Sequence, residues 1–172
     1  MTPTPTGRLL RTATGRDLVL TRRFRAPVDD VWASIAESER TARWIGPWTA
    51  EAGGTGVAGT VVLTMTAEEG SPTADLRITA CAPPHHLAVS FVDEHGTWEL
   101  EVTLHEADGV TELTLTHHLA ETAQPGDTGP GWEYYLDRLV ASRDGELLPD
   151  FDDYYPTQRA YYEEAAAALA QG

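Results

Sequence analysis

The sequence has no lysine, because all twelve of its basic residues are arginines. That absence excludes a Schiff-base lysine and the phosphate-binding lysine of a P-loop. A single cysteine, Cys81, cannot form an internal disulfide and cannot supply a thiolate zinc cluster. No stretch approaches the roughly 18 apolar residues that a membrane span requires, and the N-terminus lacks the apolar segment of a secretory signal. We therefore expect a cytoplasmic protein.

Positive charge is scarce as well: 12 arginines stand against 27 acidic residues, which gives a formal net charge of −15. Such acidity argues against nucleic acid or an anionic membrane as the principal partner. The charge is uneven, since residues 1–25 hold six arginines and one acidic residue. Much of the acidity is expected on the outer faces of strands and on the tail. An acidic, solvated shell around a largely uncharged interior follows from this distribution.

The spacing of apolar residues predicts one α+β domain, and the length of 172 residues suits one sizeable core. A strand is expected at 17–25, followed by a helix that starts after Pro27 and a short helix over 40–44. Over 48–119 the apolar residues repeat with a period of two, and turn signals interrupt them at short intervals. Such short connections predict five to six strands that pair as an antiparallel meander with one apolar face.

The helical period returns near the C-terminus. A Gly/Pro-rich link is expected at 124–131, followed by a helix whose apolar stripe begins at Trp132 and which ends at Gly145. This is the only long helix available in the core, so we expect it to lie in the concave face of the sheet. Beyond it, an acidic-aromatic stretch leads into an alanine-rich helix that is expected to begin at Pro156 and to dock on the domain.

These patterns divide the chain into three parts. Residues 1–16 are expected to form a flexible N-terminal arm, residues 17–148 the folded domain, and residues 149–172 an acidic-aromatic linker with a C-terminal helix. The expected order within the domain is a strand, two short helices, a curved meander and the long helix.

Two features that would indicate a cofactor or a metal fail in their context. Residues 54–59 match the dinucleotide pattern GxGxxG, but the segment after them predicts a strand where that motif requires a helix. We interpret them as a Gly-rich β-turn. The adjacent pairs His85-His86 and His117-His118 cannot chelate a metal from extended strands, because successive side chains point to opposite faces. We expect no cofactor and no metal site.

Several residues are expected to surround a cavity between the sheet and the long helix. His117 continues the inward face of Leu113 and Leu115, where it could orient a ligand or act as a general base. The alternative is a neutral core histidine bonded to the long helix. Trp32 and Trp132 have core spacing on their helices and are assigned to packing. Five other inward side chains fit a ligand pocket and plain core packing equally well: Trp44, Met65, Phe91, Trp98 and Tyr135.

Five phrases stand in a definite order within residues 17–148: RRFRAPVDDVWASI, RWIGPW, ITACAPPHHLAVSF, TELTLTHHL and GWEYYLDRLVASRDG. Their order and spacing resemble the helix-grip superfamily of START, SRPBCC and Bet v-like domains. The resemblance is strongest to its AHSA-type branch, the relatives of the activator of the heat-shock Hsp90 ATPase. One departure is that His85-His86 follow the PP turn, where the family usually has arginine. The tail lies outside the common core.

This resemblance implies a curved antiparallel sheet wrapped around a long C-terminal helix, with a deep apolar cavity between them. Members bind lipids, sterols, polyketides or hormones; some are cyclases, and AHSA-type domains can contact chaperones. The leading hypothesis is a protein that binds a small hydrophobic or aromatic molecule. The alternatives are a polyketide cyclase or aromatase that uses His117, and a module that regulates a chaperone ATPase. Because no Ser-His-Asp or Cys-His pair can be placed, an enzyme is the less favoured hypothesis.

Overall fold

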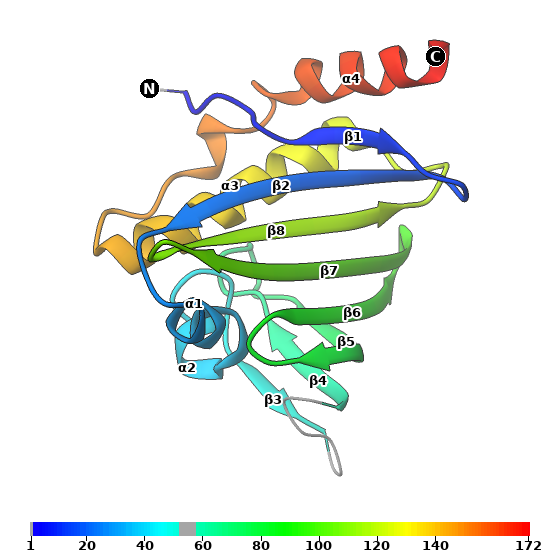
Figure 1. The fold of residues 1–172 in the computed structure, drawn as a ribbon. Helices are drawn as coiled ribbons and strands as arrows, with labels where there is room; N and C mark the ends of the chain where they lie inside the picture. Colours follow the sequence, from blue (N-terminus) through cyan, green and yellow to red (C-terminus); the bar gives the residue numbers. More distant parts are fainter. Residues whose placement is uncertain (1, 52–57) are drawn as a thin grey trace.

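One curved sheet wrapped around a long helix forms the fold of residues 2–51 and 58–172, the ranges that the computed structural model describes (Figure 1). Within these ranges, eight antiparallel strands follow the order β1-β2-β8-β7-β6-β5-β4-β3. The same ranges contain four α-helices, of which α3 crosses behind the sheet in Figure 1. The expected α+β, helix-grip fold is therefore confirmed.

The elements agree with the expected order from the first strand to the long helix. Residues 54–57 of the expected Gly-rich β-turn lie outside the described ranges. Along the chain the elements are β1 (Arg8–Arg11), β2 (Arg16–Phe24), α1 (Val28–Ala36), α2 (Ser38–Thr41), β3 (Trp48–Ala50), β4 (Gly59–Thr64), β5 (Thr73–Ala82), β6 (His86–Asp93), β7 (Gly96–Ala107), β8 (Val110–Leu119), α3 (Pro125–Asp144), a 3-10 turn (Phe151–Asp153) and α4 (Arg159–Gln171).

Two short strands at the sheet edges exceed the five to six that the sequence predicts. β1 has four residues and β3 has three, which is too short for a period of two to be visible. β1 lies inside the segment expected as an arm and pairs with β2, with Leu9 opposite Leu18. β1 is ordered by its backbone hydrogen bonds to β2, which its own short sequence does not indicate.

The long helix begins earlier than the sequence predicts. Residues 125–131, expected as a Gly/Pro-rich link, are helical and form the first turns of α3. Pro125 suits the first turn, because the amide it lacks would have no partner inside the helix. Gly129 lies where α4 approaches closely, since a Cβ at this position would come within 2.5 Å of the Tyr162 ring. Glycine that looks like a helix breaker here permits close packing of two helices.

One row of cross-strand partners shows how unevenly the inner face of the sheet is covered. Leu18, His117, Leu100, Val89 and Ile78 lie opposite one another on β2, β8, β7, β6 and β5. Leu18 is fully buried and His117 is only 4% exposed, on the side where α3 packs. The other three side chains are half-buried. The inner face therefore has a covered half at β2 and β8, and a more open half at β5 to β7.

The C-terminal tail packs back onto the N-terminal edge of the sheet. α4 begins at Arg159, three residues after the expected Pro156, and lies beside β1 (Figure 1). Its Tyr162 is fully buried, which agrees with the expectation that this helix docks on the domain. Among the helices of the described ranges, none combines the length and the apolar character needed to cross a membrane.

Candidate functional site

Five aromatic rings form a continuous series from the open half of the sheet to α3. Phe91 on β6 stacks on Trp98 of β7 with ring centroids 5.3 Å apart, and Trp98 stacks on His117 of β8 at 4.7 Å. Trp132 of α3 meets the His117 ring edge-on at 6.2 Å and lies 6.3 Å from Tyr135. We call these five residues the aromatic series.

The local structure explains why these rings meet. Phe91 and Trp98 are direct cross-strand partners, so their side chains share one face of the sheet. Trp132 and Tyr135 are three residues apart on α3 and therefore share one face of the helix. The series thus places flat aromatic surface beside the half-buried apolar side chains of β5 to β7.

His117 is the polar group of the series. Its Nδ1 accepts a hydrogen bond from the indole Nε1 of Trp132 at 3.2 Å. An indole N–H can only donate, so Nδ1 carries no proton and the neutral ring holds its proton on Nε2. Burial, and then the neighbouring His118, lower the pKa of His117 to about 4. Among the described residues, none forms a hydrogen bond with Nε2, which leaves this N–H as a donor for a ligand.

We expect the His117 ring to remain neutral far below the pH at which a free histidine becomes charged. The measurement is an NMR titration of the ring protons, in which His117 should show a midpoint near its pKa of about 4. An unfolded chain takes up this proton near pH 6.5, as an ordinary histidine does. Protonation of His117 in the unfolded chain therefore lowers stability as the pH falls from about 6.5 toward 4. A midpoint at or above 6.5 would contradict the buried, neutral assignment.

Polar contacts from α3 join Tyr135 to the loop after β4 and join Arg138 to Trp44. The Tyr135 hydroxyl donates to the exposed Glu68 carboxylate at 2.6 Å. Burial, together with this hydrogen bond to Glu68, raises the pKa of Tyr135 well above its ordinary value. On α3, the Arg138 Nε donates to the carbonyl oxygen of Trp44 at 2.7 Å, and the Arg138 guanidinium lies over the Tyr134 ring.

The structure brings together four of the six side chains expected around a cavity. Phe91, Trp98 and His117 are in direct contact, and Tyr135 joins them through a residue that the sequence assigned to packing, Trp132. The helical spacing of Trp132 to Tyr135 is the signal that could have added it. The remaining two lie apart from this series. Trp44 is 8% exposed, and its indole N–H donates to the Ser34 carbonyl oxygen at 2.8 Å, which ties it to α1. Met65 is half-buried just beyond the end of β4.

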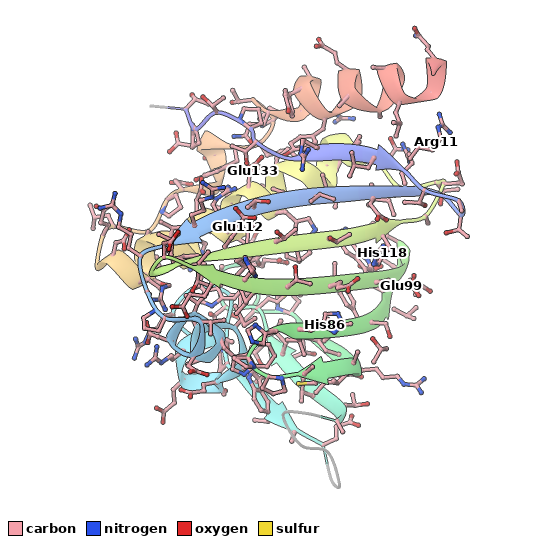
Figure 2. The ribbon with its side chains drawn as sticks, viewed as in Figure 1. Arg11, His86, Glu99, Glu112, His118 and Glu133 are labelled. Atoms are coloured by element: carbon pink, nitrogen blue, oxygen red, sulfur yellow. The ribbon has the colours of Figure 1, made fainter. Side chains whose placement is uncertain are left out.

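His86 and His118, the second members of the two adjacent histidine pairs, face the outer, convex side of the sheet. His118 contacts Asp17 at 2.8 Å and Glu101 at 3.2 Å, and His86 contacts the same Glu101 at 2.6 Å. Figure 2 labels both histidines on this face, away from α3. Partial burial lowers the pKa of His118, but the hydrogen bonds to Asp17 and Glu101 outweigh this effect and raise the pKa overall. The adjacent ring of His117 shifts in the opposite direction, because the two faces of one strand meet different surroundings.

No group of three or more histidine, cysteine, aspartate or glutamate side chains in the part of the chain that the structure describes could hold a metal ion. The aromatic series offers ring faces on which a flat molecule can stack and one imidazole N–H that can donate a hydrogen bond.

The curved sheet and the helix that it surrounds define a helix-grip domain. The chain belongs to the family described as Activator of Hsp90 ATPase homolog 1-like protein, whose sequence model matches residues 25–142. This agrees with the resemblance drawn from the five sequence phrases. No curated protein matches the chain.

Solved structures from three bacteria share the fold. The crystal structure of CalU16 from Micromonospora echinospora is 25% identical, covers 98% of each chain and has a TM-score of 0.71. The protein encoded by BPP1335 from Bordetella parapertussis is also 25% identical, over 97% of this chain and 91% of that one, with a TM-score of 0.66. EF2215 from Enterococcus faecalis is 20% identical over 96% and 91%, with a TM-score of 0.70, which shows the fold alone.

Proposed function

We propose that this protein binds a small, flat aromatic molecule between α3 and the open half of the sheet. The observation that carries the proposal is the aromatic series, in which Trp98 stacks on both Phe91 and His117. Half-buried inward side chains on β5 to β7 supply apolar surface beside it. Apolar walls with a few placed polar groups are typical of small-molecule sites.

His117 is proposed to donate a hydrogen bond to an acceptor atom of this ligand. A general base works best when its pKa lies near the operating pH, whereas the pKa of His117 is about 4. The neutral ring keeps its Nε2–H at neutral pH and can donate without gaining charge. These properties favour ligand binding over a polyketide cyclase or aromatase that would use His117 for proton transfer.

Calorimetric titration with 2-naphthol, a flat aromatic molecule with one hydroxyl group, tests the proposal. Wild-type protein is expected to bind it saturably. Trp98→Ala removes the ring at the centre of the series and should weaken binding by about tenfold or more. The matched control is Val92→Ala, because Val92 follows Phe91 on β6 but is 75% exposed on the outer face. This control should bind as the wild type does.

A second variant tests the hydrogen bond separately. His117→Phe keeps a ring but removes the N–H, so it should weaken binding of 2-naphthol more than binding of naphthalene, which has no acceptor oxygen. Trp98→Leu keeps a large apolar side chain at this position but removes the aromatic ring. It should unfold close to the wild-type temperature and still bind 2-naphthol weakly, which would show that the loss in Trp98→Ala does not reflect misfolding. Absence of saturable binding of both probes by the wild type, or equal affinities of the Trp98→Ala and Val92→Ala proteins, would overturn the proposal.

Family membership also supports a second candidate function, regulation of an Hsp90-type ATPase. One measurement separates it from ligand binding: the ATPase rate of an Hsp90-type chaperone with increasing amounts of this protein. Saturable stimulation would favour the second candidate, whereas a protein that only binds a small molecule leaves the rate unchanged.

A further inference from the structure

A polar cavity of about 230 Å³ lies where α1, α2 and the last turn of α3 meet, away from the aromatic series. Its lining contains three arginines, two serines and one aspartate, with no apolar side chain: Asp30, Ser34, Arg40, Arg43, Ser142 and Arg143. A cationic lining is unexpected in a chain with a formal net charge of −15, and it calls for a physical reason.

Asp30 holds two of the three guanidinium groups in place. Its Oδ2 accepts a hydrogen bond from Arg143 at 2.6 Å, and its Oδ1 accepts one from Arg40 at 2.8 Å. Hydrogen bonds from Arg143 and then Arg40 hold the pKa of Asp30 below its ordinary value, so the carboxylate stays charged. Arg143 is fixed further by donating to Ser34 Oγ at 2.6 Å. Both guanidiniums are therefore oriented before any ligand arrives.

Arg43 supplies charge that the cavity does not neutralise. Its exposed side chain forms no hydrogen bond or ion pair with any residue in the described ranges. The lining thus carries three positive charges and one negative charge, and Asp30 already uses both its oxygens on Arg40 and Arg143. One further carboxylate stands next to the lining, that of Glu37, with Oε2 3.6 Å from Arg40 Nε, so one positive charge remains in excess. The hydroxyl of Ser142 donates to the Leu139 carbonyl oxygen at 2.9 Å.

We propose that this cavity binds a phosphate group, either as inorganic phosphate or as the phosphate end of a small molecule. Guanidinium groups present planar arrays of N–H donors that match the oxygens of phosphate, and such charge-assisted bonds are among the stronger ones in proteins. Two guanidiniums oriented by Asp30 reduce the entropy lost on binding. Arg43 closes onto the bound group and adds the remaining charge. The site is independent of the aromatic series and of any ligand bound there.

Titration with inorganic phosphate at low ionic strength, followed by calorimetry, tests this site. Wild-type protein should bind phosphate saturably, and Arg43→Gln should weaken binding by about tenfold. The matched control is Arg77→Gln, since Arg77 is an exposed arginine on the distant strand β5. It removes the same charge and should leave binding unchanged. Because the Arg43 side chain is exposed and forms no hydrogen bond or ion pair in the described ranges, its variant should unfold at the wild-type temperature without phosphate.

A second titration with phenyl phosphate distinguishes the two sources of the group. Tighter binding of phenyl phosphate than of phosphate supports a phosphorylated small molecule, and equal or weaker binding supports free phosphate. Trp98→Ala should bind phosphate as the wild type does, which separates this proposal from the aromatic ligand. No saturable phosphate binding, or equal losses in the Arg43→Gln and Arg77→Gln proteins, would overturn the proposal.

Discussion

Glu133→Ala is expected to lower the free energy of unfolding by about 3–5 kcal/mol. Glu133 on α3 is 1% exposed, yet four other residues donate hydrogen bonds to its carboxylate. Arg22 Nη2 donates at 2.7 Å, the Tyr162 hydroxyl at 2.6 Å and the Gly7 amide at 2.8 Å, and the Thr6 amide donates as well. Alanine would leave the buried Tyr162 hydroxyl and Gly7 amide without their acceptor, and the Arg22 guanidinium would keep only Asp137 as a carboxylate partner.

The electrostatics agree with this role. Burial by itself would raise the pKa of Glu133. Hydrogen bonds from Tyr162, Arg22 and the two backbone amides outweigh this effect and hold the pKa below its ordinary value. One carboxylate therefore joins the N-terminal segment, β2, α3 and α4. Glutamine at this position accepts some of the same bonds but pairs poorly with Arg22, so Glu133→Gln should be intermediate.

Urea unfolding measures the effect, and Glu112→Ala is its matched control. Glu112 pairs with Arg23, the neighbour of Arg22, at 2.8 Å, but its side chain is 39% exposed and that of Arg23 is 75% exposed. Figure 2 labels both glutamates. A surface pair contributes below about 1 kcal/mol, so the control should unfold nearly as the wild type does. Similar losses in the two variants would show that Glu133 does not join these four segments through a buried network.

Gly129→Ala is expected to destabilise the protein by about 2 kcal/mol, although alanine has a higher helix propensity than glycine. Alanine favours a helix over glycine by about 1 kcal/mol, so propensity alone predicts a gain. In the folded protein, however, the new Cβ would come within 2.5 Å of the Tyr162 ring. That ring is fully buried and its hydroxyl is bound to Glu133, so it cannot move aside without breaking a hydrogen bond.

Gly131→Ala, two residues further along α3, is the control. A Cβ at Gly131 meets no atom within 4 Å, so the same substitution should stabilise the protein by about 0.5–1 kcal/mol. Opposite signs in thermal unfolding are the expected result. If both variants were stabilised, α4 would not pack on α3 as closely as the structure has it.

The helix-grip fold could be predicted because its signals are local. The period of two over 48–119 and the helical period from Trp132 arise from the geometry of the local backbone, which does not depend on the tertiary surroundings. Alternation also predicts that His117 points inward, since Leu113 and Leu115 precede it on the same face. The sequence does not predict the early start of α3, because Gly126 and Gly129 are typical of a link between elements. Glycine fits these two positions because α4, a segment about thirty residues further along the chain, packs closely against them.

The candidate site was predictable only in part, for the same reason. Sequence spacing placed Phe91, Trp98, His117 and Tyr135 on inward faces, but it could not say which rings would touch. The series depends on the register of β6, β7 and β8, and on how α3 crosses them. Register decides whether two inward rings become neighbours, and it is set by pairing across strands rather than within one.

The lack of lysine and the surplus of acidic residues are properties of the sequence alone, as are the order of elements and the faces on which side chains lie. Tertiary structure decided where the few positive charges stand: Arg22 inside a buried network, and Arg40, Arg43 and Arg143 around one cavity. It also decided that Glu133 accepts bonds from residues up to 127 positions away. Periodicity is a local property of the backbone, whereas the partners of a polar group are chosen only when distant segments meet.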